Sequence, residues 1–159
     1  METQGSSPVP DRIDKQVLLR APRERVWRAV SDSAEFGRWF RVRFDGPFVV
    51  GAAVRARVID PPRYAHLTFV VEVEALEPMN LFSYRWHPAA LDPAVDYSSE
   101  PTTKVTFTLE DAPGGTLLRV SETGFQALPP ARRAHVFDLN ESGWEEQMRR
   151  VESHVSQAN

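Results

Sequence analysis

The fold is decided by Leu117-Leu118-Arg119-Val120-Ser121-Glu122-Thr123-Gly124-Phe125, which leads into a long amphipathic segment that carries Asn140-Glu141-Ser142-Gly143-Trp144. The first part alternates apolar and polar residues, a pattern typical of a half-buried strand. Gly124-Phe125 interrupts this alternation, and from about Ala131 to Val155 apolar residues recur at helical spacing. The pattern predicts a sheet packed against one closing helix, which favours a ligand-binding shell over a catalytic machine.

Length and composition limit the class of protein. The chain has 159 residues, of which 42% are hydrophobic, and this fits one globular domain. A net charge of −3 without a basic block excludes a nucleic-acid footprint, and the absence of cysteine excludes disulfides and thiolate metal sites. No apolar run is long enough to span a membrane, and the first residues lack the apolar core of a signal peptide. We therefore expect a cytoplasmic protein with a disordered leader over 1–12 and a single domain over 13–155.

The part of the chain before the closing helix is expected to be mostly strands. A first strand is expected over 13–20, and Ala21-Pro22 then opens a helix because proline suits the first helical position. A second, short helix is expected over 35–40, broken at Gly37. Alternation between strong turn signals predicts six further strands, over 42–48, 53–59, 66–76, 81–87, 102–110 and 116–123. Short connections between strands with one apolar face favour an antiparallel meander.

One connection is long. Residues 87–101 contain three prolines, Pro88, Pro93 and Pro101. Long loops in compact domains are either lids over a site or flexible tips. We interpret this segment as a plain flexible loop, with a lid as the alternative.

Four short motifs resemble, in order, those of a known superfamily. They are Ala21-Pro22 followed by Val26-Trp27, then Phe36-x-x-Trp39-Phe40, Glu122-Thr123-Gly124-Phe125 and Asn140-x-x-Gly143-Trp144. Over residues 13–155 the chain resembles the START-like (SRPBCC, birch-pollen-allergen-like) superfamily. Within it, the chain is similar to bacterial proteins that resemble the C-terminal domain of the activator of the heat-shock-protein-90 ATPase.

The resemblance implies an α+β helix-grip fold. In this fold a curved antiparallel sheet of six or seven strands wraps around a long C-terminal helix, and two short helices follow the first strand. Families on this scaffold include lipid and sterol carriers, polyketide aromatases/cyclases, hormone receptors and co-chaperone domains. The fold alone therefore leaves the function open.

Side chains that face the gap between sheet and helix are the candidate ligand-binding residues. If they pack tightly they form a core, and if the helix stands off the sheet they line an apolar cavity. The candidates are Trp39, Phe48, Phe69, Val71, Phe82, Tyr84, Trp86, Phe107, Val120, Glu122, Asn140, Gly143 and Trp144.

Three of these candidates have two interpretations each. Glycine inside a helix costs about 1 kcal/mol relative to alanine, so we interpret Gly143 as a close approach of the helix to the sheet, with ligand clearance as the alternative. Glu122 alternates in phase with Val120, which points it inward; we expect it at the sheet rim, either wet or paired with Arg85, with a buried ligand-orienting role as the alternative. Asn140 is interpreted as a structural amide bonded to strand backbone, with ligand contact as the alternative.

The sequence favours a non-catalytic binding protein. Its partner would be a small hydrophobic molecule, such as a lipid, a sterol or a polyketide-like compound, held between the sheet and the C-terminal helix. The four histidines lack paired metal-ligand spacing and no phosphate-binding glycine loop is present, so we expect no metal and no other cofactor. Two alternatives stay open: a co-chaperone-like module with a chaperone partner, and an aromatase/cyclase-type enzyme in which Glu122, His87 and Tyr84 move protons.

Overall fold

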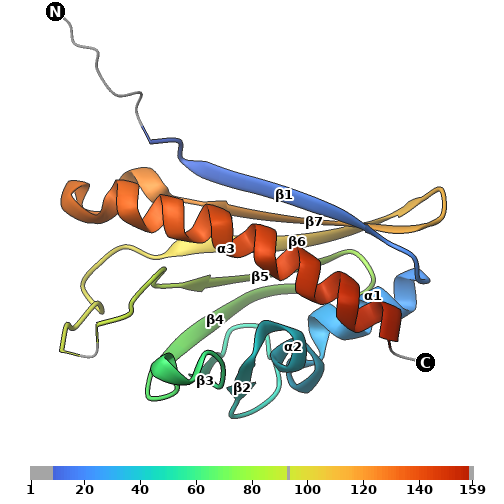
Figure 1. Cartoon of the computed structure of the whole chain (residues 1–159), viewed down its shortest axis with the longest axis horizontal. Helices are drawn as coiled ribbons and strands as arrows, with labels where there is room; N and C mark the ends of the chain where they lie inside the picture. Colours follow the sequence, from blue (N-terminus) through green and yellow to red (C-terminus); the bar gives the residue numbers. More distant parts are fainter. Residues whose placement is uncertain (1–8, 93, 158–159) are drawn as a thin grey trace, which may run out of the picture.

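The computed structural model describes residues 9–92 and 94–157, and its strands form one curved antiparallel sheet with a long helix across one face (Figure 1). The strand order is β1-β7-β6-β5-β4-β3-β2. The strands are β1 (Arg12–Leu19), β2 (Val42–Phe44), β3 (Ala53–Val58), β4 (Thr68–Glu77), β5 (Leu81–Trp86), β6 (Thr103–Ala112) and β7 (Gly115–Thr123). The helices are α1 (Arg23–Ser31), α2 (Ser33–Phe40) and α3 (Pro130–Gln157), with the short 3₁₀ turns η1 (Pro62–Tyr64) and η2 (Phe125–Ala127). The predicted helix-grip fold is confirmed.

Strand β7 has the alternation that the sequence indicated. It lies between β1 and β6, with Glu122 opposite Ile13 on one side and Val105 on the other. Leu118, Val120 and Glu122 are all buried, so they share the face that α3 covers. The chain leaves this strand at Gly124, whose φ of 107° lies in the left-handed region that glycine adopts without strain.

The two short helices differ from the prediction in detail. Pro22 precedes α1 as its N-cap instead of occupying the first helical position. Helix α2 begins at Ser33 and continues through Gly37, so the predicted break at this glycine is wrong. A Cβ at Gly37 would lie 2.5 Å from the carbonyl oxygen of Val42, and the missing side chain therefore lets β2 pass close to α2.

The last residues of the predicted leader are hydrogen-bonded to the end of another strand. The Asp11 carbonyl oxygen accepts hydrogen bonds from the backbone N–H groups of Gly124 (3.0 Å) and Phe125 (3.3 Å), and β1 begins at Arg12. Residues 9–12, which we assigned to the leader, are therefore held against the end of β7, while residues 1–8 lie outside the described residues.

The long loop is attached to the first turn of α3. The Arg132 guanidinium lies 3.2 Å from a carboxylate oxygen of Glu100 and donates to the carbonyl oxygen of Pro88 at 3.3 Å. Its Cζ also lies 4.8 Å from the centre of the Tyr97 ring. One arginine thus holds both ends of the loop, whose Pro93 lies outside the described residues.

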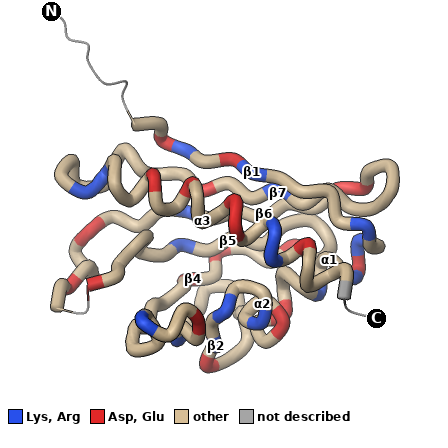
Figure 2. Tube along the Cα trace, viewed as in Figure 1, with Lys and Arg blue, Asp and Glu red and all other residues tan. Residues whose placement is uncertain are grey.

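Aromatic rings fill much of the space between α2 and the sheet. Phe36 lies at their centre, with ring centroids 5.7 Å from Phe48, 6.2 Å from Phe82 and 5.7 Å from Phe107. Helix α3 closes the other part of the interior with the predicted apolar stripe. Its members are all buried: Phe137, Trp144, Met148, Val151 and Val155. Outside this core, acidic and basic residues are interspersed over the described chain (Figure 2).

A buried acid, Glu35, joins the three helices. Its side chain is almost fully buried, bonds to Arg25, and accepts a hydrogen bond from Arg28 at 3.2 Å. The His154 ring of α3 contacts the same carboxylate at 3.0 Å. Burial alone would raise the pKa of Glu35, but the hydrogen bonds from His154 and Arg25 outweigh it, and the pKa of this carboxyl lies below its usual value.

Glu35 should make the stability of the protein depend on pH. Because its pKa is lower in the folded than in the unfolded chain, its contribution is present above the unfolded pKa and is lost as pH falls through the folded pKa. We expect the difference in unfolding free energy between wild type and Glu35→Gln to be largest near neutral pH and to shrink below about pH 4, as urea denaturation at a series of pH values would show. Glu152→Gln, at an exposed position of the same long helix that carries His154, is the matched control. A difference in unfolding free energy between wild type and Glu35→Gln that stays constant with pH would contradict the prediction.

Candidate functional site

The buried carboxylate of Glu122 lies at the centre of the candidate site. Its Oε1 accepts hydrogen bonds from the Trp144 indole at 2.8 Å and from the Asn140 amide at 2.9 Å. Its Oε2 accepts from the Trp86 indole at 2.8 Å and from the Thr103 hydroxyl at 2.5 Å. The residue is fully buried, with 0% exposure, and all four donors are neutral. The charge is therefore compensated by hydrogen-bond dipoles alone, and we call this arrangement the Glu122 network.

The network corrects two sequence interpretations. Glu122 is neither at a wet rim nor paired with Arg85, since that arginine bonds to Glu74 at 2.8 Å. Asn140 bonds to the Glu122 side chain, where strand backbone was expected as its partner. Both corrections follow from the inward phase of Glu122 along β7, which brings its carboxylate under α3 where the amide and two indoles can reach it.

A small hollow of about 150 Å³ opens beside the network. Three aromatic rings form much of its wall, with centroids 6.1 Å apart for Phe40 and Trp86, 5.9 Å for Phe40 and Trp144, and 6.1 Å for Trp86 and Trp144. The complete lining is Phe40, Trp86, Asn140, Gly143, Trp144 and Gln147. The hollow thus lies where α2, β5 and α3 meet.

Gly143 borders open space. A Cβ at this position would meet no atom within 4 Å outside its own helix, so the interpretation as a close approach to the sheet is wrong. The glycine instead leaves the helix surface bare at the wall of the hollow. This outcome agrees with the alternative interpretation, clearance for a ligand.

Two residues of the lining were not among the predicted site residues. Gln147 lies four residues after Gly143, and its Oε1 is buried without a hydrogen-bond partner. Helical spacing from Asn140 and Gly143 could have indicated it. Phe40 ends α2, and the sequence pointed to its neighbour Trp39, whose indole instead donates to the Ala29 carbonyl oxygen at 2.8 Å and lies in the core.

The other predicted site residues lie in the packed interior. Phe48 and Phe82 have ring centroids 4.6 Å apart, and Phe82 stacks on Phe107 at 6.1 Å. Val71 and Val120 are buried in the same core, and Phe69 is half-buried beside Trp86, with centroids 5.7 Å apart. The structure therefore brings together four of the thirteen candidates at the hollow and places Glu122 behind them.

The residues proposed for proton transfer do not form a relay. Burial, followed by the charge of Glu122, raises the pKa of the Tyr84 phenol well above its ordinary value, which keeps this group neutral. The His87 ring contacts the carbonyl oxygen of Glu100 at 3.0 Å, and both oxygens of Glu122 are occupied by hydrogen bonds from other residues.

Within residues 9–92 and 94–157, no three acidic or histidine side chains are placed to hold a metal ion. None of the helices in this part of the chain is both long enough and apolar enough to cross a bilayer.

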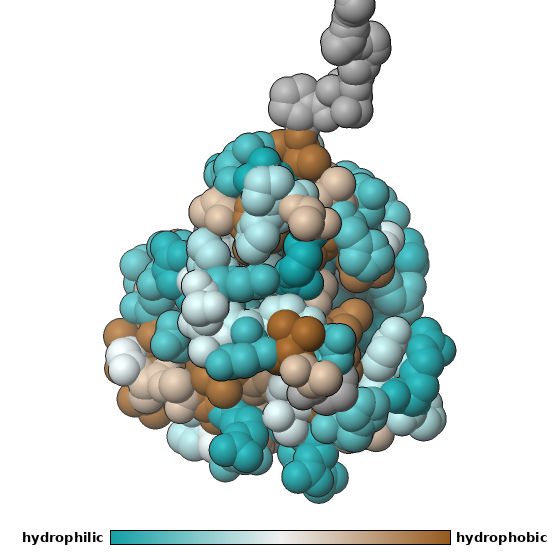
Figure 3. All heavy atoms as spheres, turned by 90° about the vertical axis from the view of Figure 1, so that its left-hand side faces the viewer, coloured by the Kyte–Doolittle hydropathy of each residue, from teal (hydrophilic) through white to brown (hydrophobic). Residues whose placement is uncertain are grey.

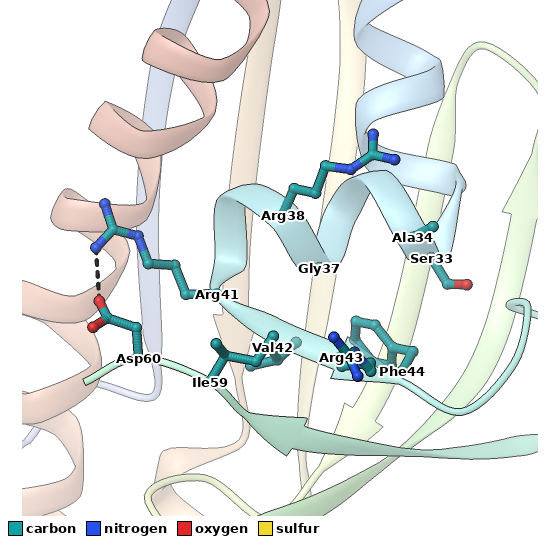
Figure 4. Close-up of a pocket in the computed structure, with 10 residues that line it drawn as sticks. All are labelled: Ser33, Ala34, Gly37, Arg38, Arg41, Val42, Arg43, Phe44, Ile59 and Asp60. Carbon is teal, nitrogen blue, oxygen red and sulfur yellow. Dashed lines mark hydrogen bonds and ion pairs between the residues drawn. The ribbon is translucent and has the colours of Figure 1, made fainter. Parts of the chain in front are cut away.

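A larger hollow of about 410 Å³ lies between α2, the strand β2 and the two residues that follow β3, Ile59 and Asp60 (Figure 4). Its wall includes Gly37 and Phe44, and at one end Arg41 extends to an ion pair with Asp60 at 2.7 Å. The residues drawn in Figure 4 include none of the predicted site residues. The hollow beside the Glu122 network, in contrast, is lined by four of the predicted site residues.

Loss of the Glu122 carboxylate from its network should destabilise the protein strongly. Glu122→Gln places an amide N–H group among donors, which leaves at least one buried donor without an acceptor, and we expect a loss of about 3 kcal/mol in unfolding free energy. Glu74→Gln is the matched control, because it removes the same charge from a partly exposed ion pair and should cost less than about 1 kcal/mol. Chemical denaturation of both variants measures the difference. Equal losses would show that the buried hydrogen bonds carry no special weight.

Comparison with known proteins agrees with this architecture. A family model described as "Activator of Hsp90 ATPase homolog 1-like protein" matches residues 20–156. The solved structure of protein MLL2253 from Mesorhizobium loti is 26% identical, with coverage of 93% of this chain and 98% of that chain and a TM-score of 0.72. No curated protein matches the chain.

Two further solved structures share the fold at lower identity. DynU16, described as a putative protein in the dynemicin biosynthetic locus, is 24% identical with a TM-score of 0.71; the match covers 93% of this chain and 48% of DynU16, so this chain spans about half of its length. The Aha1 dimer from Colwellia psychrerythraea is 15% identical, with coverage of 92% and 96% and a TM-score of 0.68. At these identities the likeness extends to the fold alone.

Proposed function

The chain belongs to the family of activator of Hsp90 ATPase homolog 1-like proteins, and from that premise we propose that it binds a small apolar or aromatic ligand, without catalysing a reaction, in the hollow beside the Glu122 network. The observation that carries the proposal is the bare helix surface at Gly143, where a side chain would meet open space. Helical glycine is unfavourable by about 1 kcal/mol relative to alanine, and no packing contact at this position accounts for it.

The size of the hollow limits the ligand. A cavity of about 150 Å³ is the size that holds one benzene ring. Because the hollow is open to the surface, this size limits the part of a ligand that it holds: a small aromatic molecule fits whole, whereas a lipid, a sterol or a polyketide-like molecule fits by one end. The rings of Phe40, Trp86 and Trp144 provide apolar contact for such a group.

The state of the neighbouring polar groups supports binding without chemistry. The Glu122 carboxylate is occupied by four donors, so it has no free position from which to take a proton from a ligand. Tyr84 is held neutral by its raised pKa. We therefore assign Glu122 and Tyr84 a structural role, which is to support the residues that form the wall of the hollow.

Filling the hollow should abolish binding. Gly143→Leu places a side chain in the open space, and we expect it to remove the change in tryptophan fluorescence that indole or benzyl alcohol produces in the wild type, since Trp86 and Trp144 line the hollow. Ser142→Leu adds the same side chain at the exposed neighbouring position and serves as the matched control. Gly143→Ala should raise the unfolding free energy by up to about 1 kcal/mol. Unchanged binding by Gly143→Leu would remove the hollow as the site.

A protein-interaction role is the second candidate function. At the end of the molecule that carries the long loop, Val70 and Val95 are each 46% exposed on either side of a hollow of about 440 Å³ between β4 and that loop. Figure 3 views this end of the molecule and shows apolar surface interspersed with polar side chains. Exposed apolar surface of this kind marks contact sites for other proteins, and the family name points to Hsp90 as the partner.

This second role has a direct measurement. If the chain acts as a co-chaperone, we expect its addition to raise the ATPase rate of purified Hsp90, and Val95→Asp to reduce that effect several-fold by placing a charge on the apolar surface. Val49→Asp, at an exposed valine elsewhere, is the control. An ATPase rate that does not respond to saturating wild-type chain would exclude the role.

A further inference from the structure

We propose that the hollow beside the Glu122 network selects a small organic cation, an aromatic ring carrying a protonated amine, over neutral and anionic molecules of the same shape. This inference rests on the proposed ligand-binding function and names the chemical class of its ligand. Two independent features of the wall lead to it: a buried charge without a cationic partner, and a cluster of aromatic rings.

The first feature is a buried negative charge without a cationic partner. Trp86, Thr103, Asn140 and Trp144 donate to Glu122, and each of them is neutral. The nearby cations of β5 and β6 are engaged elsewhere, because Arg85 and Lys104 both pair with Glu74, at 2.8 and 3.3 Å. The six residues that line the hollow carry no charge. The Glu122 carboxylate is hydrogen-bonded to three of these six residues, Trp86, Asn140 and Trp144, and its negative charge favours a positive ligand.

The second feature is the arrangement of the rings. The centroids of Phe40, Trp86 and Trp144 form a nearly equilateral triangle with sides of 5.9 to 6.1 Å. A cation centred above this triangle lies within about 6 Å of all three centroids up to a height of about 5 Å, which is the range of cation–π attraction. Both indole N–H groups point their hydrogens at a carboxylate, which increases the electron density of the rings that the cation meets.

Three probes of the same ring and nearly the same size separate these possibilities: benzylammonium, benzyl alcohol and benzoate. Titrations at neutral pH and constant ionic strength, followed by NMR of the indole N–H signals, measure the three dissociation constants. We expect benzylammonium to bind roughly tenfold more tightly than benzyl alcohol, and benzoate to bind more weakly than both.

The outcomes distinguish this inference from the proposed function. If benzyl alcohol binds in the hollow as tightly as benzylammonium or more tightly, the function stands and the cation preference is overturned. If none of the three binds and Gly143→Leu behaves as the wild type, both fail. Benzylammonium binding that is tighter than benzyl alcohol binding and that Gly143→Leu abolishes supports both.

Variants connect the preference to the wall. Glu122→Gln should bring the affinities for benzylammonium and benzyl alcohol close together, but this variant loses buried hydrogen bonds and its folding is at risk. Phe40→Leu keeps an apolar wall, removes one ring and leaves the Glu122 network intact, so it should lower the ratio of the two affinities several-fold. Phe44→Leu, at a half-buried phenylalanine outside the hollow, is the matched control and should keep the wild-type ratio. An unchanged ratio in Phe40→Leu would overturn the role of the rings.

Discussion

The carboxylate of Glu122 is the constraint on which the rest of the structure depends. From β7 it reaches Trp86 on β5, Thr103 just inside β6, and Asn140 and Trp144 on α3. A single side chain therefore fixes three neighbouring strands to the helix that covers them. Removing an ionised group from water is costly, and only a complete set of donors makes its burial tolerable. The requirement for four donors in one place dictates the height and rotation of α3 over the sheet, and with them the positions of the two tryptophans that form the hollow.

The aromatic cluster around Phe36 determines how much of the interior remains open. Phe36 extends from α2 into contact with Phe48, Phe82 and Phe107, and these rings fill the region beneath β5 and β6. In this fold the sheet and the long helix can enclose a large cavity, and here α2 occupies part of that space. What is left is a ring-sized hollow at the end of α2, where Phe40 is the last residue of the helix and Gly143 leaves the opposite wall bare. The dimensions of the site follow from how far α2 enters the space between sheet and helix.

The sequence was sufficient for features that depend on local periodicity. Alternation along 117–123 placed Glu122 inward, and the spacing of Phe137, Trp144, Met148 and Val151 defined the buried face of α3. It was insufficient where the answer depends on which distant residues meet. The partners of Glu122 are separated from it by 36 and 22 residues for the two indoles, and no local pattern shows that both indole N–H groups converge on one carboxylate. The same limit applies to Gly143 and Gly37: both are helical glycines, but one faces open space and the other lies against β2, a difference set by tertiary packing.

In our proposal, the Glu122 network has a structural role and a role towards the ligand. A buried ionic group is a weak source of net stability, because well-packed apolar residues of similar volume do as well or better, so stability alone does not account for placing a carboxylate beneath two tryptophans. What the carboxylate adds is a fixed orientation of its neighbours. It fixes the rotation of both indoles and places a negative charge behind the wall of the hollow. A ligand bound there, as we propose, would contact Trp86 and Trp144, the residues that hold α3 to the sheet. Its binding free energy therefore adds to the stability of the folded chain. Under the proposed function, the charge that organises the core is also the charge that selects the ligand.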